Sequence, residues 1–134
     1  MSKITIHSDG AARGNPGPSG AGAVLRDEKD SVVAQVCEYL GEMTNNQAEY
    51  SALIFALEEA KRLGATGVAI FADSELMVKQ IMGEYKVKNE GLKPLFQQVV
   101  KALRAIGPYT IEHLPRERNK EADKLANRAI DENF

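Results

Sequence analysis

Val68-Ala69-Ile70-Phe71-Ala72-Asp73-Ser74 is a nearly continuous apolar run that ends in a carboxylate. Such a run predicts a short strand that is buried on both faces, as strands in parallel pairings are. Ligands of open α/β sheets bind beyond the carboxyl ends of the strands. The run therefore predicts an α/β domain with a functional site near Asp73.

The segments on either side of this run show strand patterns first and helix patterns later. Residues 3–9 (KITIHSD) place Ile4 and Ile6 on one face and polar residues on the other, which predicts a strand. Turn residues at 14–20 and charged residues at 27–30 separate two further strands. We expect strands near 3–9, 21–27, 31–40, 68–72 and 109–114, and helices near 44–63, 74–82, 92–105 and 119–130. The order β-β-β-α-β-α-α-β-α predicts an antiparallel meander followed by parallel strands, with Asn119 as the N-cap of the last helix.

Length and composition bound the class of protein. The 134 residues fit one domain, 1–134, with 43% hydrophobic and 27% charged residues. The formal net charge of −2 argues against a protein that holds nucleic acid by bulk charge alone. It does not exclude a nucleic-acid enzyme, because a cation-binding carboxylate cluster lowers the charge count. The single cysteine, Cys37, and the lack of a membrane-length apolar run or leader predict a cytoplasmic protein without membrane association. Nothing in the sequence indicates oligomerisation, so a monomer is expected.

Two carboxylates stand at the ends of expected strands. Asp9 ends the first strand, and Asp73 ends the strand at 68–72. If these strands are parallel neighbours, about 4.8 Å apart, their terminal side chains face one crevice. The alternative is that each acid caps a turn or a helix, which for Asp9 before Gly10 is about equally common.

Two more carboxylates lie on expected helices. Glu49 heads the apolar stripe of helix 44–63, where an unpaired charge at the edge of the buried face is costly. Asp123 lies one turn into the last helix and shares a face with Ala126 and Ile130. The alternatives are a glutamate that reaches solvent or pairs with a base, and an aspartate that stabilises the helix dipole.

Together the four acids predict a site for hard cations. Carboxylates gathered in one crevice repel one another, so that protons or cations must compensate them. Ligand sets made of oxygen select ions such as Mg²⁺ or Mn²⁺. Zinc is disfavoured because His7, His113 and Cys37 are scattered, and the sequence has neither a Walker-type phosphate loop nor a G-x-S-x-G elbow. The remaining chemistry is metal-assisted attack of water on a phosphate ester.

Four motifs together resemble the type 1 ribonuclease H family (ribonuclease HI), in a short form without its basic protrusion. Residues 9–18 (DGAARGNPGP) resemble the opening motif of the family, and residues 44–49 (TNNQAE) resemble its first-helix motif. Asp73-Ser74 after an apolar strand resembles the third motif, and residues 119–126 (NKEADKLA) resemble the fourth. Each motif alone is weak, but the four stand in the family order on the expected elements and span nearly the whole chain.

The resemblance implies a ribonuclease H-like α/β fold, with a five-stranded mixed sheet (three antiparallel strands plus two parallel) and helices on both faces. It implies an endoribonuclease that cuts the RNA strand of RNA/DNA hybrids by a two-metal-ion mechanism and leaves 5′-phosphate and 3′-hydroxyl products. The implied catalytic residues, which also hold two Mg²⁺ or Mn²⁺ ions, are Asp9, Glu49, Asp73 and Asp123. The implied substrate contacts are Gly10, Asn15, Asn46 and Glu49 at 2′-hydroxyl groups, and Thr44 and Asn45 at the hybrid backbone.

Two segments depart from the family pattern. Many members carry a histidine in a loop before the last aspartate, whereas His113 is expected here on a strand, as a structural residue. Arg118 is the first candidate to assist at the phosphate in place of that histidine, and Arg116 is the second. The long basic insertion is replaced by residues 83–91, where Tyr85 with its neighbouring lysines is the candidate to contact the DNA strand. The alternative for this segment is an ordinary solvated loop.

Other functions also fit parts of the sequence. A junction resolvase or exonuclease on the same fold is disfavoured by Asn15 and residues 44–46, which serve a hybrid. A non-catalytic or weakly active nucleic-acid-binding module fits the missing loop histidine and basic insertion, but not the presence of all four carboxylates. A domain whose acids are only caps would tolerate Asp73→Asn without functional loss.

Overall fold

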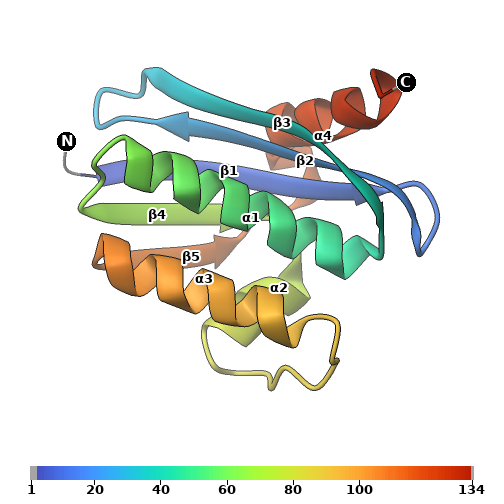
Figure 1. Cartoon of the computed structure of the whole chain (residues 1–134). Helices are drawn as coiled ribbons and strands as arrows, with labels where there is room; N and C mark the ends of the chain where they lie inside the picture. The colour runs from blue at the N-terminus through green and yellow to red at the C-terminus, as the bar shows by residue number, and fades with distance from the viewer. Residues whose placement is uncertain (1–2, 134) are drawn as a thin grey trace.

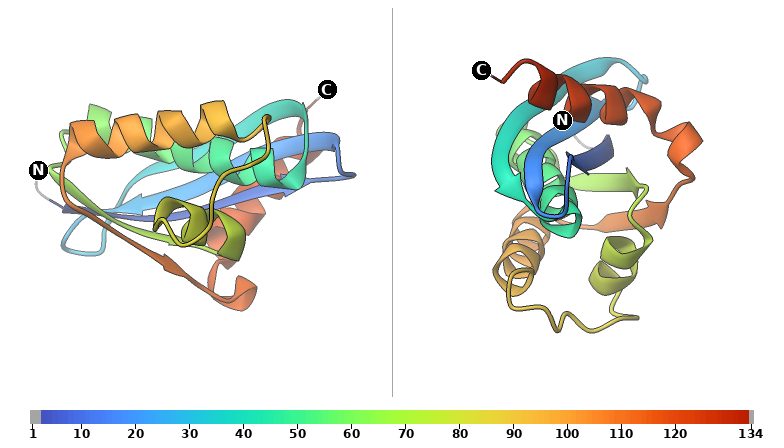
Figure 2. Two further views of the ribbon diagram at one scale, coloured as in Figure 1. Left: turned by 90° about the horizontal axis from the view of Figure 1, so that it is seen from below. Right: turned by 90° about the vertical axis from the view of Figure 1, so that its right-hand side faces the viewer.

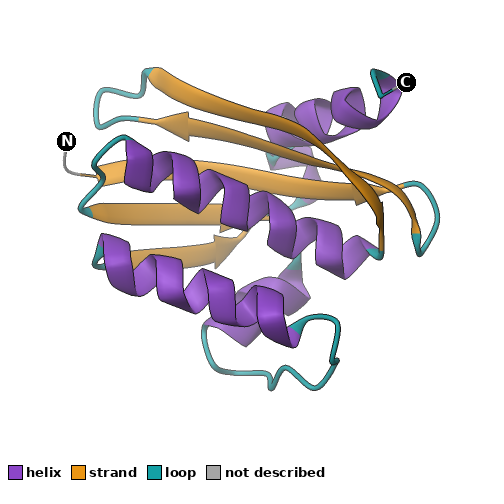
Figure 3. Ribbon diagram, in the orientation of Figure 1, coloured by secondary structure: helices purple, strands orange, loops and turns teal. Residues whose placement is uncertain are grey.

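The computed structural model describes residues 3–133, and its elements follow the predicted order (Figure 3). The strands are β1 (Lys3–Ala12), β2 (Gly17–Arg26), β3 (Val32–Met43), β4 (Gly67–Ala72) and β5 (Tyr109–His113). The helices are α1 (Asn45–Arg62), α2 (Glu75–Ile81), α3 (Lys93–Ile106), the 3₁₀ turn η1 (Arg116–Arg118) and α4 (Lys120–Asp131). Among residues 3–133, no helix combines the length and apolar character that crossing a lipid bilayer requires.

The strands form one mixed sheet in the order β3-β2-β1-β4-β5 (Figure 1). β1, β2 and β3 are antiparallel neighbours, whereas β4 runs parallel to both β1 and β5. α1 and α3 cover one face of this sheet and α4 packs on the other, as the two further views show (Figure 2). The predicted mixed sheet with helices on both faces is therefore confirmed.

The core lies between the sheet and α1. β4 is an interior strand, and its Val68 and Ile70 are almost fully buried, which explains the apolar run in the sequence. The predicted stripe of α1 faces the sheet, with Ala52, Leu53 and Ala56 inaccessible to solvent. α1 begins at a capping box formed by Thr44 and Gln47. The side-chain oxygen of each residue accepts a hydrogen bond from the backbone N–H of the other.

β1 is longer than the sequence pattern predicts, and this corrects the expected place of Asp9. The strand does not end at Asp9 but continues to Ala12, because β2 pairs with it as far as Ser19. The parallel ladder with β4 does end there, at the Ser8–Ala72 pair. Asp9 and Asp73 are therefore each the first residue beyond that ladder, and the expected proximity arises without a strand end at Asp9.

α4 lies unusually close to the sheet because β2 presents glycine to it. A Cβ atom placed on Gly22 would lie 2.1 Å from the carbonyl oxygen of Ala122, a distance that real side chains do not reach. Asn119 occupies the N-cap position of α4, but the expected capping bond is absent from its side chain. Its Nδ2 instead donates to the carbonyl oxygen of Ser8 at 2.8 Å. The start of α4 is thus fixed to β1 directly, and Asp123 follows one turn later.

Gly22→Ala is predicted to destabilise the protein by roughly 1–3 kcal/mol, because its methyl group would displace the backbone of α4. Urea unfolding measures this change in the free energy of unfolding. Gly67→Ala is the matched control, since the nearest atom to its added Cβ is 3.3 Å away. Equal losses in the two variants would contradict the close approach of α4.

Candidate active site

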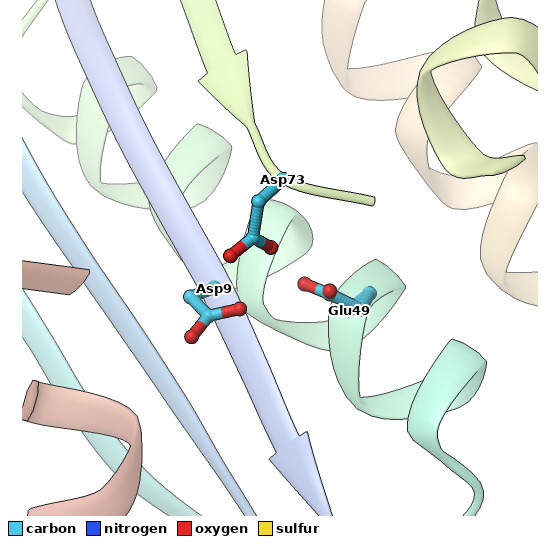
Figure 4. Close-up of side chains that lie close together, drawn as sticks. All are labelled: Asp9, Glu49 and Asp73. Carbon is cyan, nitrogen blue, oxygen red and sulfur yellow. The ribbon is translucent and has the colours of Figure 1, made fainter. Parts of the chain in front are cut away.

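Three carboxylates from three separate elements meet at the end of the β1–β4 ladder (Figure 4). Asp9 comes from β1, Glu49 from α1, and Asp73 from the connection that follows β4. One carboxylate oxygen of each lies within 4.8 Å of those of the other two. Asp9 and Glu49 are 4% and 5% exposed and Asp73 is half-buried, so two of the three carboxylates are largely shielded from solvent.

The approach of α1 to β1 brings Glu49 into this cluster. The backbone N–H of Gly10 donates to Oε1 of Glu49 at 2.8 Å. A Cβ atom on residue 10 would lie 2.2 Å from the carbonyl carbon of Ala48, so only glycine allows this contact. Gly10, expected from the resemblance to contact substrate, therefore also orients a carboxylate.

Burial and repulsion from neighbouring carboxylates both disfavour the charged forms of Asp9 and Glu49. Burial is the main cause that raises the pKa of Asp9 well above its usual range, followed by repulsion from Glu49 and Asp73. Burial and the charge of Asp73 likewise raise the pKa of Glu49, against which the hydrogen bond from Gly10 acts. Among residues 3–133, none of the three pairs with a lysine or arginine. A divalent cation would supply the missing positive charge, and three oxygen donors suit Mg²⁺ or Mn²⁺.

The cluster opens into a cleft of about 380 Å³, and Asp123 lines it from the side of α4. Asp123 lies outside the set of three mutually close oxygens, and its side chain is 30% exposed. It is nevertheless near enough to Asp9 to form a hydrogen bond that contributes to the raised pKa of Asp9. The four predicted acids thus share one cleft, with three at its base and Asp123 at its rim.

Arg118, the first candidate from the sequence, does not line the cleft, whereas the second candidate, Arg116, does. Arg116 lines the cleft, and its Nη2 lies 3.8 Å from Oδ1 of Asp123. Arg118 lines a separate cavity with His7 and Arg26. The two arginines stand two positions apart on the 3₁₀ turn η1, which has three residues per turn and so directs them to different sides. His113 ends β5, as expected, and is exposed.

The expected substrate contacts are divided between the cleft and the surface beyond it. Gly10 and Asn45 line the cleft, and the N–H of Asn45 donates to Oδ1 of Asn15 at 3.0 Å. Thr44 caps α1, and Asn46 is exposed on its first turn. Tyr85 does not line the cleft, and its hydroxyl group lies 3.4 Å from Nζ of Lys79 instead.

Sequence reasoning missed two polar residues that line the cleft, Arg13 and Asn127. Both stand inside or beside motifs that the sequence does show. Arg13 lies in the stretch DGAARGNPGP, and Asn127 follows Asp123 by four residues, so that both face the same side of α4. That spacing was the available signal for Asn127.

Comparisons with known proteins identify relatives that match nearly the whole chain. A family model described as reverse transcriptase-like matches residues 7–129. A bifunctional protein of Mycobacterium tuberculosis is 43% identical over 96% of this chain, and ribonuclease HI of Halobacterium salinarum is 38% identical over 97%. The chain spans 36% and 65% of the lengths of these two relatives. Ribonuclease H of Dechloromonas aromatica is 34% identical over 96% of the chain and 94% of its own length.

Solved structures show the same fold. RNase H1 of Halobacterium salinarum superposes with a TM-score of 0.94 at 38% identity, covering 98% of this chain and 99% of that one. LC11-RNase H1, crystallised in complex with an RNA/DNA hybrid, gives a TM-score of 0.91 at 44% identity and covers 96% of both chains.

The charge cluster predicts a stability that depends on pH and on divalent ions. Because the pKa values of Asp9 and Glu49 are raised on folding, the folded protein binds more protons than the unfolded chain between the ordinary and the raised values. Without divalent ions, the free energy of unfolding should therefore fall as the pH rises through this window. Asp9→Asn should be more stable than the wild type in EDTA near pH 8, by roughly 1 kcal/mol or more, and should lose this advantage near pH 4.

Thermal melts in EDTA and in Mg²⁺ at several pH values measure the effect. Mg²⁺ should stabilise the wild type and leave Asp9→Asn almost unchanged. Glu58→Gln, an exposed acid on α1, is the control and should match the wild type. A lower melting temperature of Asp9→Asn in EDTA near pH 8 would contradict a repulsive cluster.

Proposed function

This chain belongs to the ribonuclease H family, and from this premise we propose that it is an endoribonuclease that hydrolyses the RNA strand of RNA/DNA hybrids. The observation that supports the proposal most strongly is the buried and uncompensated cluster of Asp9, Glu49 and Asp73 at the base of an open cleft. The relative that was crystallised with an RNA/DNA hybrid has the same fold and supports this substrate class.

The donor set of the cluster fits divalent cations. Asp9, Glu49 and Asp73 would hold them at the base of the cleft, and Asp123 would complete the set from the rim. The chemistry that divalent ions bound to these carboxylates would supply is the activation of water as the nucleophile and the stabilisation of charge on the leaving 3′ oxygen. Hydrolysis with this polarity leaves a 5′-phosphate and a 3′-hydroxyl group.

The chain's own residues bind and orient the hybrid. The N–H of Gly10 holds the Glu49 carboxylate in place, while Asn45, linked to Asn15, faces the same cleft. Selection of RNA requires contacts to the 2′-hydroxyl, the group that distinguishes the two strands, and both asparagine amides can donate and accept such hydrogen bonds. Arg116 would bind the phosphate as a fixed donor, because a guanidinium group does not act as a base near neutral pH.

A cleavage assay tests this function. The protein is incubated with a labelled RNA/DNA hybrid in Mg²⁺ or Mn²⁺, beside single-stranded RNA, duplex DNA and the Asp73→Asn variant. We expect cleavage of only the RNA strand of the hybrid, with loss of activity in Asp73→Asn. A folded wild-type protein that binds the hybrid but cuts nothing in either ion would instead indicate a non-catalytic binding module.

Arg116→Ala is predicted to lower kcat on the hybrid by about ten- to a hundredfold, which is the range for loss of a hydrogen bond to a charged group. Arg118→Ala is the matched control, and its kcat should stay close to that of the wild type. Steady-state kinetics of both variants measure the difference. A larger loss in Arg118→Ala than in Arg116→Ala would restore the sequence-based preference.

A further inference from the structure

The turn between β1 and β2 is connected to the cleft through the side chain of Arg13. Its Nη1 lies 2.6 Å from Oδ1 of Asp131, near the end of α4. Its Nη2 donates to Oδ1 and to the carbonyl oxygen of Asn127, at 3.3 and 3.4 Å. Asn127 in turn donates from Nδ2 to Oδ1 of Asp123 at 3.2 Å and to its carbonyl oxygen at 3.0 Å. A continuous chain of contacts therefore runs from the end of α4 to the carboxylate at the rim.

The chemistry of these groups fixes the orientation of the Asn127 amide. A guanidinium group only donates hydrogen bonds, so Arg13 holds the amide oxygen of Asn127 toward itself. The NH₂ end of the same amide must then face Asp123, which as a carboxylate only accepts. Rotation of the amide by half a turn would place its oxygen against the carboxylate and lose both contacts.

The position of Asn127 also indicates a role beyond the stability of the helix. It lies in the interior of α4, where asparagine is a poor helix former compared with alanine. Its side chain reaches back one turn and lines the cleft together with Arg13 and Asp123. Asp123, unlike Asp9 and Glu49, is partly exposed and lies outside the tight cluster, so its orientation depends on such contacts.

We propose that Arg13 is a positioning residue that, through the amide of Asn127, holds Asp123 in the orientation in which it accepts a divalent cation. The inference rests on the proposed function but concerns residues other than the four carboxylates. Partners that hydrogen-bond to metal ligands typically change cation affinity by about ten- to a hundredfold when they are removed. Here the partner is itself held by an arginine from another element.

Calorimetric titration of the metal-free protein with Mg²⁺, without hybrid, tests this role. Arg13→Lys keeps the charge but loses the fork that contacts Asp131 and Asn127 at once. Arg13→Lys and Asn127→Ala should each weaken Mg²⁺ binding by about tenfold, and the double variant by no more than either single one, because all three break the same chain. Arg128→Gln, which breaks an exposed ion pair on the same helix, is the control and should bind Mg²⁺ like the wild type.

A second measurement does not depend on the cation. In ¹H–¹⁵N spectra recorded in EDTA, the side-chain amide signals of Asn127 should shift in Arg13→Lys and stay in place in Arg128→Gln. Unchanged Asn127 signals in Arg13→Lys, or additive losses of Mg²⁺ affinity in the double variant, would overturn the inference.

The remaining outcomes separate this inference from the proposed function. If Arg13→Lys and Asn127→Ala both bind Mg²⁺ with the affinity of the wild type, the positioning role is overturned and the proposed function is not. Failure of the wild type to bind either Mg²⁺ or Mn²⁺ in the same titration would overturn the proposed function and the inference together. Arg13→Gln removes the positive charge that Arg13→Lys keeps. If Arg13→Lys binds Mg²⁺ like the wild type, and the KM for the hybrid rises only in Arg13→Gln, the inference is overturned and Arg13 is a direct phosphate contact.

Discussion

Electrostatic repulsion among buried carboxylates is the constraint on which the rest of this structure depends. Oxygens of Asp9, Glu49 and Asp73 come within 4.8 Å of one another, and burial and neighbouring charge together oppose the ionisation of Asp9 and Glu49. Such a cluster does not hold itself together in the absence of cations. The surrounding fold must supply the free energy that keeps the three side chains in place, and the apolar contacts of β4 and α1 are the source closest to the site.

Small residues allow the scaffold to approach the cluster closely enough. Gly10 permits α1 to lie against β1, and Gly22 permits α4 to lie against β2, each at a distance that any side chain would prevent. The same approaches bring Glu49 and Asp123 to the cleft. Packing and function therefore both require glycine at positions 10 and 22, and a substitution that moves either helix away from the sheet also moves a carboxylate.

The sequence predicts those features that follow from burial patterns. The apolar run at 68–72 predicted an interior parallel strand, and the stripe on α1 placed Glu49 at the edge of the core; both follow from periodicity alone. Periodicity does not predict that Asp9 lies inside β1, since this depends on how far β2 continues to pair with β1. The choice between Arg116 and Arg118 likewise depends on the direction in which a three-residue turn projects its side chains, which periodicity does not encode.

α4 shows how contacts that periodicity cannot predict complete the site. Its first turn is fixed to β1 by the bond from Asn119 to the carbonyl oxygen of Ser8, and its last turn is fixed to the β1–β2 connection by the ion pair of Arg13 and Asp131. Both attachments join residues more than a hundred positions apart in the chain. Asp123 lies between them, on a helix held at its start by β1 and at its end by the connection that follows β1. A fourth carboxylate can thus stay at the rim of a repulsive cluster, because the attachments of α4 fix its backbone and the Asn127 amide contacts its side chain.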